Sequence, residues 1–288
     1  MSSQGTNFTC KYKLRARGKV LRLSRPAVMG IINLTPDSFY DGGSLHSAGD
    51  ILRRADKYLA DGAAILDLGA VSTRPGAAGV NEAEEMRRLL PALKLLRNSF
   101  PNTFISVDTF RASVALAAAE EGADIINDIS GGTFDAEMFA TVAKTKLPYV
   151  IMHIQGTPRT MQINPRYKNV VKEVFGFLRI QAGKAERAGV KQIIIDPGFG
   201  FGKTVTHNFT LLRELKKFEQ LKKPILAGLS RKSLVNKTLG AGAAEGLNGT
   251  TVVNTLALLN GANILRVHDA RQAAEVIELC RAYAGIKK

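Results

Sequence analysis

The stretch FISVDTFRASVALAAAEEGADIIND, residues 104–128, contains one strand–helix–strand repeat of this chain. The apolar run FISV ends at Asp108, residues 111–121 have helical periodicity, and the run DII ends at Asn127 and Asp128. Continuous Val, Ile and Leu runs of this length are typical of strands buried on both faces, as in a parallel sheet whose crossovers are helices. We therefore interpret this stretch as one βα unit followed by the next strand.

The same pattern occurs eight times along the chain. The predicted strands are residues 28–32, 65–68, 104–107, 125–128, 149–152, 193–196, 225–228 and 263–267. Helical periodicity follows at 50–61, 81–98, 111–121, 135–145, 169–188, 206–221, 250–260 and 269–284, with an additional short helix at 231–239. Eight units in 288 residues fit the α/β class and a (β/α)8 TIM barrel, a fold that typically needs about 250 residues.

The composition favours a single domain. With 45% hydrophobic residues and no low-complexity tract, residues 1–288 can bury one large core, which we place at about 27–284. Residues 8–25 alternate loosely around Gly18 and predict an N-terminal β-hairpin that closes the bottom of the barrel. The stripe LLPALKLL, residues 89–96, is expected to face the core.

Charge and cysteine content limit the possible partners. The net charge is +15, but Lys and Arg are spread along the chain and no nucleic-acid-binding motif accompanies them, so we expect no specific nucleic-acid partner. A positive field favours anionic substrates such as phosphate-bearing ligands. Cys10 and Cys280 are too few for a disulfide framework, and no apolar stretch approaches the length of a membrane span, so we expect no membrane association and a cytoplasmic location.

Polar side chains end nearly every predicted strand. In a TIM barrel the reactive residues stand at these carboxyl ends, where the βα loops gather. The loops LTPDSFYDGG and AVSTRPGAAG follow the first and second strands, and loops of this length are usually lids or binding segments. We expect both to be mobile and to close over bound substrate.

Eight motifs in order resemble the dihydropteroate synthase family. They are GIINLTPDSFYDGG (30–43), DLGAVSTRPGA (67–77), SVDTF (106–110), INDISGG (126–132), MHIQGTPRTMQ (152–162), IDPGFGFGK (195–203), GLSRKS (228–233) and RVHD (266–269). The resemblance covers about residues 20–284. One departure is Val71, where Glu is common in the family before Ser-Thr-Arg-Pro.

The resemblance implies a transferase of folate biosynthesis. Its reaction joins (7,8-dihydropterin-6-yl)methyl diphosphate to 4-aminobenzoate and gives 7,8-dihydropteroate and diphosphate. It also implies Mg²⁺ as cofactor, small-molecule substrates as partners, a homodimer and sulfonamides as inhibitors. The residues expected to be catalytic are Asp108, Lys232, Arg74 and Asn33.

A pterin ring presents adjacent N–H donors along a flat edge, for which buried carboxylates are good acceptors. The residues expected to bind it are Asp108, Asn127, Met152, Asp196, Phe201, Gly228 and Lys232, with Met152, Phe201 and Gly228 against the ring faces. The alternative is that Asp108 and Asp196 are helix caps or residues that fix loops.

The other two subsites need different groups. The residues expected at the diphosphate are Asn33, Thr73, Arg74, Arg266 and His268, with Asn33 as the Mg²⁺ ligand. Arg266 and His268 could instead form a structural ion-pair cluster. The residues expected at the aminobenzoate are Phe39, Thr73, Pro75 and Ser233, although a Ser at this position is ordinarily a helix cap.

The chemistry needs no strong base, because an aniline nitrogen is neutral at physiological pH. We expect a dissociative, SN1-like route in which the protein stabilises the departing diphosphate and the electron-deficient methylene. The competing enzyme is a pterin-binding barrel that presents methyltetrahydrofolate to a corrinoid, which would lack SRKS and RVHD. The competing non-enzyme is a silent pterin-binding or scaffolding barrel, which should have lost Lys232, Arg74 or Arg266.

Two further motifs are interpreted as support for the site. The glycines of GFGFGK, residues 198–203, more plausibly allow the backbone close to a flat ring than cradle a phosphate, because the phosphate-loop spacing is absent. His153 follows the fifth strand, and a supporting role behind the site is at least as plausible as contact with substrate.

Overall fold

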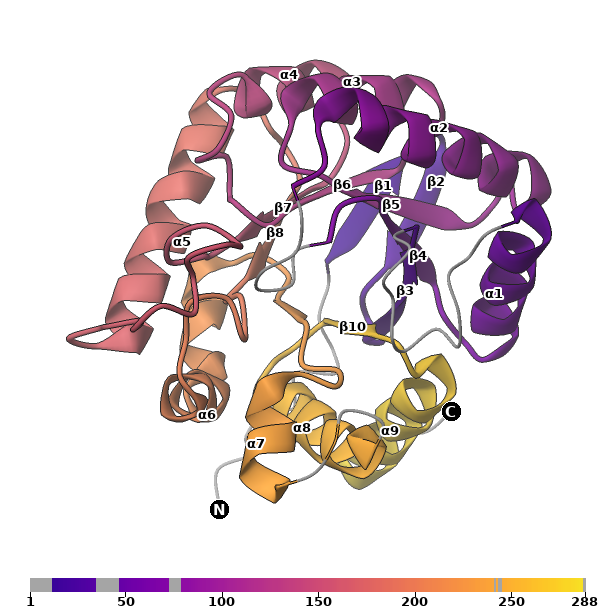
Figure 1. Cartoon of the computed structure of the whole chain (residues 1–288). Coiled ribbons are helices and arrows are strands. Elements are labelled where there is room, and N and C mark those ends of the chain that lie inside the picture. The colour runs from indigo at the N-terminus through magenta and orange to yellow at the C-terminus, as the bar shows by residue number, and fades with distance from the viewer. Residues whose placement is uncertain (1–11, 35–46, 73–78, 241, 243–244, 287–288) are drawn as a thin grey trace.

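A ring of eight parallel strands forms the centre of the molecule (Figure 1). The computed structural model describes residues 12–34, 47–72, 79–240, 242 and 245–286. Neighbouring strands follow the order β8-β7-β6-β5-β4-β3-β10-β9, and a bridge between Ile195 and Ile225 joins β8 to β9. The predicted (β/α)8 barrel is therefore confirmed. The strands are β3 (Ala27–Asn33), β4 (Ile65–Gly69), β5 (Phe104–Asp108), β6 (Ile125–Asp128), β7 (Tyr149–Met152), β8 (Ile193–Asp196), β9 (Leu226–Ala227) and β10 (Ile264–Val267).

Helices between the strands cover the outside of the barrel (Figure 1). Their apolar stripes face the strands, and in α2 the predicted stripe is confirmed because Leu89, Leu93 and Leu96 are fully buried. In the described residues no helix is both long enough and apolar enough to cross a membrane. The helices are α1 (Ala48–Ala60), α2 (Glu82–Ser99), α3 (Ala112–Glu120), α4 (Met138–Thr145), α5 (Val170–Arg187), α6 (Val205–Arg213), α7 (Ser233–Leu239), α8 (Leu247–Leu259) and α9 (Ala270–Tyr283).

The continuous helix predicted over residues 206–221 is wrong. The α-helix α6 ends at Arg213, and a 3₁₀ helix, η2, runs over Leu215–Leu221. Leu215 and Phe218 are buried and stand three residues apart. That spacing places both on the buried face of this 3₁₀ helix, which has three residues per turn.

The predicted N-terminal hairpin is present at the amino ends of the barrel strands. Strands β1 (Lys13–Ala16) and β2 (Lys19–Arg22) pair antiparallel, and Arg17 and Gly18 form the turn with φ angles of 51° and 78°. Leu14 and Ala16 are buried in the main hydrophobic core. Residues 8–11 of the predicted hairpin lie outside the described part of the chain. The hairpin therefore covers the amino ends of the barrel strands, whereas the polar residues that end the strands lie at the opposite, carboxyl end.

Candidate active site

Strand register brings several predicted site residues to one level at the carboxyl end of the barrel. Across adjacent strands the Cα partners run from Asn33 to Gly69, from Gly69 to Asp108 and from Asp108 to Asn127. Residues that are paired on neighbouring strands point to the same side of the barrel wall. These side chains therefore lie together at the carboxyl-end rim of the barrel. Met152 and Asp196 are likewise partners on β7 and β8.

Arg266 of β10 links two carboxylates inside this rim. Its Nε donates to Asp67 Oδ2 at 2.6 Å, and its Nη2 donates to Asp108 Oδ2 at 2.8 Å. Only 19% of the Arg266 side chain is exposed, and the pKa of its guanidinium is raised because the two carboxylates outweigh the effect of burial. The ion-pair cluster considered as an alternative for Arg266 is therefore formed, and contact with diphosphate remains a prediction.

Asp67 was not assigned a role from the sequence. It is fully buried, and besides Arg266 its two oxygens lie 3.4 and 3.3 Å from Nδ2 of Asn127. Its carboxylate therefore holds two of the predicted site residues in place. The sequence feature that could have indicated this role is a carboxylate between apolar residues in the strand ILDLG. A charge buried in such a strand needs a partner of opposite charge or a hydrogen-bond donor.

Asp108 has a strongly perturbed acidity. Burial raises the pKa of Asp108 to about 7, the nearby carboxylates of Asp67, Glu85 and Asp128 add to the rise, and Arg266 opposes it. Perturbed groups of this kind concentrate at functional sites, because desolvation and paired charges are what tune a reacting group. Asp108 thus changes its charge near neutral pH.

Asp196 and Lys232 form the other side of the rim. Asp196 is buried and accepts a hydrogen bond from the Gly198 amide at 2.7 Å. Lys232 Nζ donates to the Phe199 carbonyl at 2.5 Å and stands 4.7 Å from the centroid of the Phe201 ring. Burial lowers the pKa of Lys232 to about 8, with Arg266 adding to the fall and Asp196 and then Asp108 opposing it. The two sides of the rim are therefore electrostatically coupled.

An apolar cluster lies beside these charged groups. It contains Met152 and Phe201, two of the three residues predicted to pack against a pterin ring, which is consistent with a flat ligand lying between charged edges and apolar faces. Its buried members are Ile129, Met152, Ile154, Met161 and Phe201, with Phe110 packed against them.

The loop of residues 198–203 is fixed from behind by a buried lysine. Lys203 is 3% exposed, and its Nζ lies 2.9 Å from His153 Nδ1 and 2.9 Å from the carbonyl oxygens of Gly198 and Phe201. Burial lowers the pKa of His153 to about 2 and that of Lys203 well below its ordinary value. The supporting role considered for His153 agrees with this position. The importance of Lys203 was missed, because the sequence interpretation concerned only the glycines.

Gly198 is required for a close contact within the protein, and the predicted approach of these glycines to a flat ring stays a prediction. Its φ is 70°, and a Cβ there would stand 1.9 Å from the His153 carbonyl oxygen. The glycine therefore permits close packing against the neighbouring loop. At Gly200, where φ is 84°, a Cβ would stand 3.2 Å from Cδ of Lys232. This second glycine leaves room for the Lys232 side chain.

The structure places His268 and Ser233 at the edge of the rim. The His268 amide donates to Ser230 Oγ at 3.2 Å, and its ring Nδ1 lies 3.3 Å from the same oxygen. Ser233 is exposed and is the first residue of α7, whereas Lys232 occupies the N-cap position. The alternative interpretation of Ser233 as the helix cap is therefore wrong. The predicted residues Phe39, Thr73, Arg74 and Pro75 lie outside the described residues.

Asn33 offers a plausible oxygen for a divalent cation. Within the described residues its side chain forms no hydrogen bond, and its Oδ1 lies 3.8 Å from the position that a Cβ on Gly69 would take. No group of three or more His, Cys, Asp or Glu residues that could enclose a metal occurs in the same part of the chain. One amide oxygen fits Mg²⁺, which usually takes few protein ligands and completes its shell with phosphate oxygens and water.

Comparison with known proteins connects this geometry to one enzyme family. A family model described as pterin binding enzyme matches residues 29–268. Dihydropteroate synthase of Escherichia coli K12 is 41% identical over 278 residues, which cover 96% of this chain and 98% of that protein. The crystal structure of Yersinia pestis dihydropteroate synthase with a sulfonamide drug has a TM-score of 0.91 at 39% identity and covers 95% of this chain and 100% of its own. That of the Xanthomonas albilineans enzyme with 4-aminobenzoic acid has a TM-score of 0.89 at 37% identity, covering 96% and 100%.

Proposed function

The chain belongs to the dihydropteroate synthase family of pterin-binding enzymes, and on that premise we propose how its residues carry out the family's reaction. It is a transferase that condenses (7,8-dihydropterin-6-yl)methyl diphosphate with 4-aminobenzoate, giving 7,8-dihydropteroate and diphosphate. The observation that supports this assignment best is the coupling of Asp108, Arg266, Asp196 and Lys232 around one rim.

The pterin is held by its edge and by its faces. In this proposal Asp196 and Asn127 accept its N–H groups, and Lys232 donates to an acceptor of the ring, since protonated Lys has three donors. Met152 and Phe201 pack against the faces. Asp67 stabilises this arrangement indirectly, because it positions Asn127 and Arg266.

The diphosphate lies toward the positively charged side of the rim. Arg266 uses Nε and Nη2 for the two aspartates, so Nη1 is available to a phosphate oxygen. His268 and Arg74 are proposed as further donors, and Asn33 as the residue that would hold Mg²⁺. When bound, the cation neutralises phosphate oxygens and makes diphosphate a better leaving group.

The protein promotes bond breaking before attack. The C–O bond between the methylene and the diphosphate breaks, both electrons leave with diphosphate, and the electron-rich dihydropterin delocalises the positive charge. Ionised Asp108 stabilises that charge, which is a preorganised electrostatic effect. The aminobenzoate nitrogen then forms the new C–N bond and loses its proton to solvent. A secondary isotope effect near unity at the methylene would contradict this order.

The aminobenzoate occupies the outer part of the site. Ser233, exposed at the start of α7, is proposed to bind its carboxylate. Phe39, Thr73 and Pro75 are proposed to enclose its ring. Sulfonamides resemble the aminobenzoate in shape and charge, so we expect them to compete for this position.

Diphosphate release from the pterin substrate tests the proposal. We expect Lys232→Ala to lose both pterin binding and turnover, with and without 4-aminobenzoate. Lys237→Ala on the exposed surface of α7 is the matched control and should leave the kinetics unchanged. A wild-type protein that bound pterin but never released diphosphate would instead indicate a silent binding barrel.

A homodimer is proposed through the outer surface of α8 and α9. Large apolar side chains are exposed there, with Val252 52%, Leu256 40%, Leu279 71% and Tyr283 82% accessible. Such a patch on a monomer is unusual and typically marks an interface. Light scattering should give two chains per particle, and one chain for Leu256→Glu. Ile180→Glu, at an exposed apolar residue of α5, should remain dimeric.

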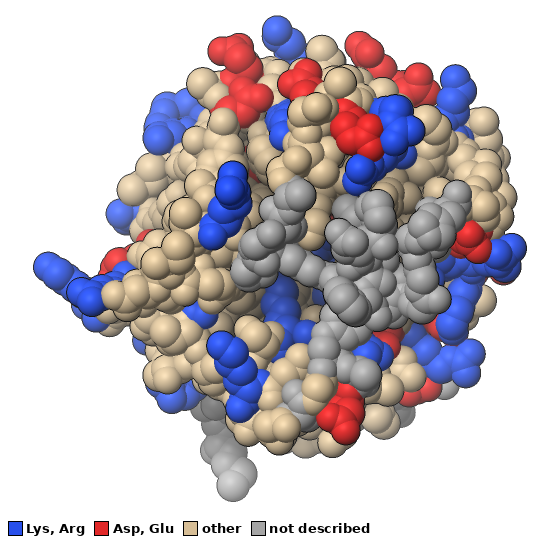
Figure 2. Space-filling view, viewed as in Figure 1, with Lys and Arg blue, Asp and Glu red and all other residues tan. Residues whose placement is uncertain are grey.

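The compartment is proposed to be the cytoplasm. Cys280 is a free, buried thiol, which agrees with a reducing environment. We propose no specific nucleic-acid partner. Figure 2 agrees with that choice, because basic side chains are dispersed over the face shown.

A further inference from the structure

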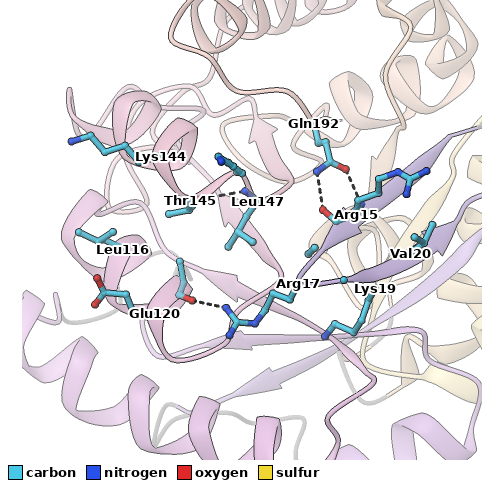
Figure 3. A pocket seen from close by; sticks show the side chains of 14 residues that line it. Arg15, Arg17, Lys19, Val20, Leu116, Glu120, Lys144, Thr145, Leu147 and Gln192 are labelled. Atoms are coloured by element: carbon cyan, nitrogen blue, oxygen red, sulfur yellow. Dashed lines mark hydrogen bonds between the residues drawn. The ribbon is translucent and has the colours of Figure 1, made fainter.

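A hollow lies at the opposite end of the barrel from the candidate active site. Its volume is about 720 Å³, and Figure 3 shows it between the N-terminal hairpin and the carboxyl ends of α3 and α4. Arg15, Arg17 and Lys19 stand on the hairpin side, and Leu116, Lys144 and Leu147 stand on the helix side. No residue of the proposed catalytic site lines it.

Three anchors hold the hairpin across the hollow. The backbone of Arg15 exchanges two hydrogen bonds with the Gln192 side chain, at 2.7 and 2.8 Å. Arg17 Nη1 donates to the Ala119 carbonyl at 3.1 Å, and Lys19 Nζ donates to Asp124 at 2.7 Å. These anchors fix the walls, so the hollow is preformed and a ligand need not order them, which lowers the cost of binding.

Part of the wall is apolar and only half covered. Val20 is 42% exposed and Leu116 is 41% exposed, and both line the hollow with the buried Leu147. An apolar group placed against Leu116 and Leu147 would remove the exposed surface of Leu116 from water, which is favourable in proportion to the area buried.

The rim of the hollow is strongly basic. Arg15, Arg17, Lys19, Lys144 and Lys146 line it, against the single carboxylate of Glu120. Of these five cations only Lys19 forms an ion pair with a described residue. The carboxyl ends of α3 and α4 each contribute roughly half a negative charge, which part of this positive charge balances. The residues that line the hollow therefore carry a net positive charge.

We propose that this hollow is a binding site for a small organic anion that carries an apolar body, such as an aryl or alkyl sulfonate, carboxylate or phosphate. The apolar body lies against Leu116 and Leu147, and the anionic group faces Arg17 and Lys146. A volume of this size is typical of small-molecule sites. The proposal is independent of the reaction at the other end of the barrel.

Three probes distinguish the contribution of the apolar body to binding from that of the anionic group. They are 8-anilinonaphthalene-1-sulfonate, its uncharged analogue N-phenyl-1-naphthylamine, and sulfate. The protein is first saturated with pteroic acid, so that the active site is filled. We expect the sulfonated dye to bind once per chain, by fluorescence and calorimetry, and the other two to bind at least about tenfold more weakly, a difference of roughly 1.4 kcal/mol. Displacement of the dye by pteroic acid, or equal affinity for the uncharged analogue, would overturn the proposal.

Variants locate the dye. Arg17 and Lys146 have φ angles of 51° and 60°, a region that Asn tolerates well, so Arg17→Asn with Lys146→Asn removes charge with little backbone strain. Dye affinity should fall about tenfold, which corresponds to roughly 1.4 kcal/mol. The matched control, Lys172→Asn with Arg179→Asn on α5, should bind as the wild type does.

Substitutions on α3 test the same binding site without altering the hairpin. Leu116→Glu places a carboxylate in the hollow from the exposed face of α3, and Leu116→Gln removes the apolar contact without adding charge. The Glu variant should lose more affinity than the Gln variant. Unchanged dye affinity in both the hairpin and the Leu116→Glu variants would refute the site.

Discussion

Arg266 and Asp67 stand 199 positions apart in the sequence, yet Nε of the arginine donates to the fully buried carboxylate at 2.6 Å. The pair connects β10 to β4 across β3, which lies between them in the barrel. Because Arg266 also donates to Asp108, Asp67 helps to fix the orientation of a guanidinium that binds the proposed catalytic aspartate. We therefore propose that Asp67 is a positioning residue.

Asp67→Asn should reduce kcat/KM for the pterin diphosphate by roughly 10- to 100-fold, the result of losing about 1.4 to 2.7 kcal/mol of transition-state stabilisation. KM for 4-aminobenzoate should change little, because Asp67 contacts Asn127 and Arg266. Steady-state kinetics with each substrate varied separately measures both. Glu186→Gln is the control, since the half-exposed Glu186 pairs with Lys223 at 2.6 Å and such surface pairs contribute little. An equal loss in both variants would argue against positioning.

The pH dependence of kcat/KM should be bell-shaped. Asp108 must be ionised to stabilise positive charge, so activity rises through its pKa of about 7. Lys232 must be protonated to donate, so activity falls above its pKa of about 8. The profile of kcat/KM reports groups of the free enzyme. Lys232→Arg should move the alkaline limb upward, and an unmoved limb would exclude Lys232 as its source.

Stability should depend on pH through the same aspartate. Between its ordinary pKa of 3.8 and about 7, folded Asp108 retains a proton that the unfolded chain loses. The free energy of unfolding should therefore fall as pH rises through this window. Denaturant unfolding at a series of pH values should show a smaller fall in Asp108→Asn than in the wild type. Parallel curves would contradict the raised pKa.

Gly198→Ala should destabilise the protein and disrupt the loop that carries Phe199 and Phe201. A Cβ would stand 1.9 Å from the His153 carbonyl oxygen, and the positive φ adds strain. We expect a loss of about 2 to 4 kcal/mol, as for other strained or overpacked substitutions. Gly176→Ala is the matched control, because nothing lies within 4 Å of its Cβ position on α5. There the free energy of unfolding should rise by up to about 1 kcal/mol.

Chelation should weaken binding of the diphosphate substrate and leave pterin binding intact. If Asn33 holds Mg²⁺, EDTA should raise KM for the pterin diphosphate but should not change the affinity for a pterin without phosphates. Asn33→Ala should reduce the response to added Mg²⁺. An unaltered Mg²⁺ titration in this variant would remove Asn33 from the metal site.

The sequence predicted the strands closely because each is a short apolar run with a polar end. The predicted ranges 125–128, 149–152 and 193–196 agree with β6, β7 and β8. The range 225–228 was too long, since β9 spans only Leu226–Ala227. There the Ile225 amide donates to the Asn263 side chain at 2.9 Å. This side-chain hydrogen bond replaces the backbone hydrogen bond that would extend the strand.

Other features of the site required the three-dimensional fold. The polar strand ends indicated Asp108, Asn127 and Asp196, but the pairing of Asp67 with Arg266 depends on closure of the barrel. The perturbed pKa values of Asp108 and Lys232 depend on burial, which spacing along the chain does not reveal. Lys203 stood at the end of a glycine-rich motif, and only its enclosure by carbonyl groups explains its role.

The junction between β8 and β9 is held by one bridge, from Ile195 to Ile225, in which the Ile195 amide donates to the Pro224 carbonyl at 2.9 Å. Asp196 lies directly on one side of this seam and Lys232 follows the strand on the other. A pterin bound to both residues would link β8 and β9 at the point where the two strands share only one bridge. Hydrogen–deuterium exchange at the Ile195 amide should then slow markedly on pterin binding. The bound substrate would thus stabilise closure of the barrel as well as react.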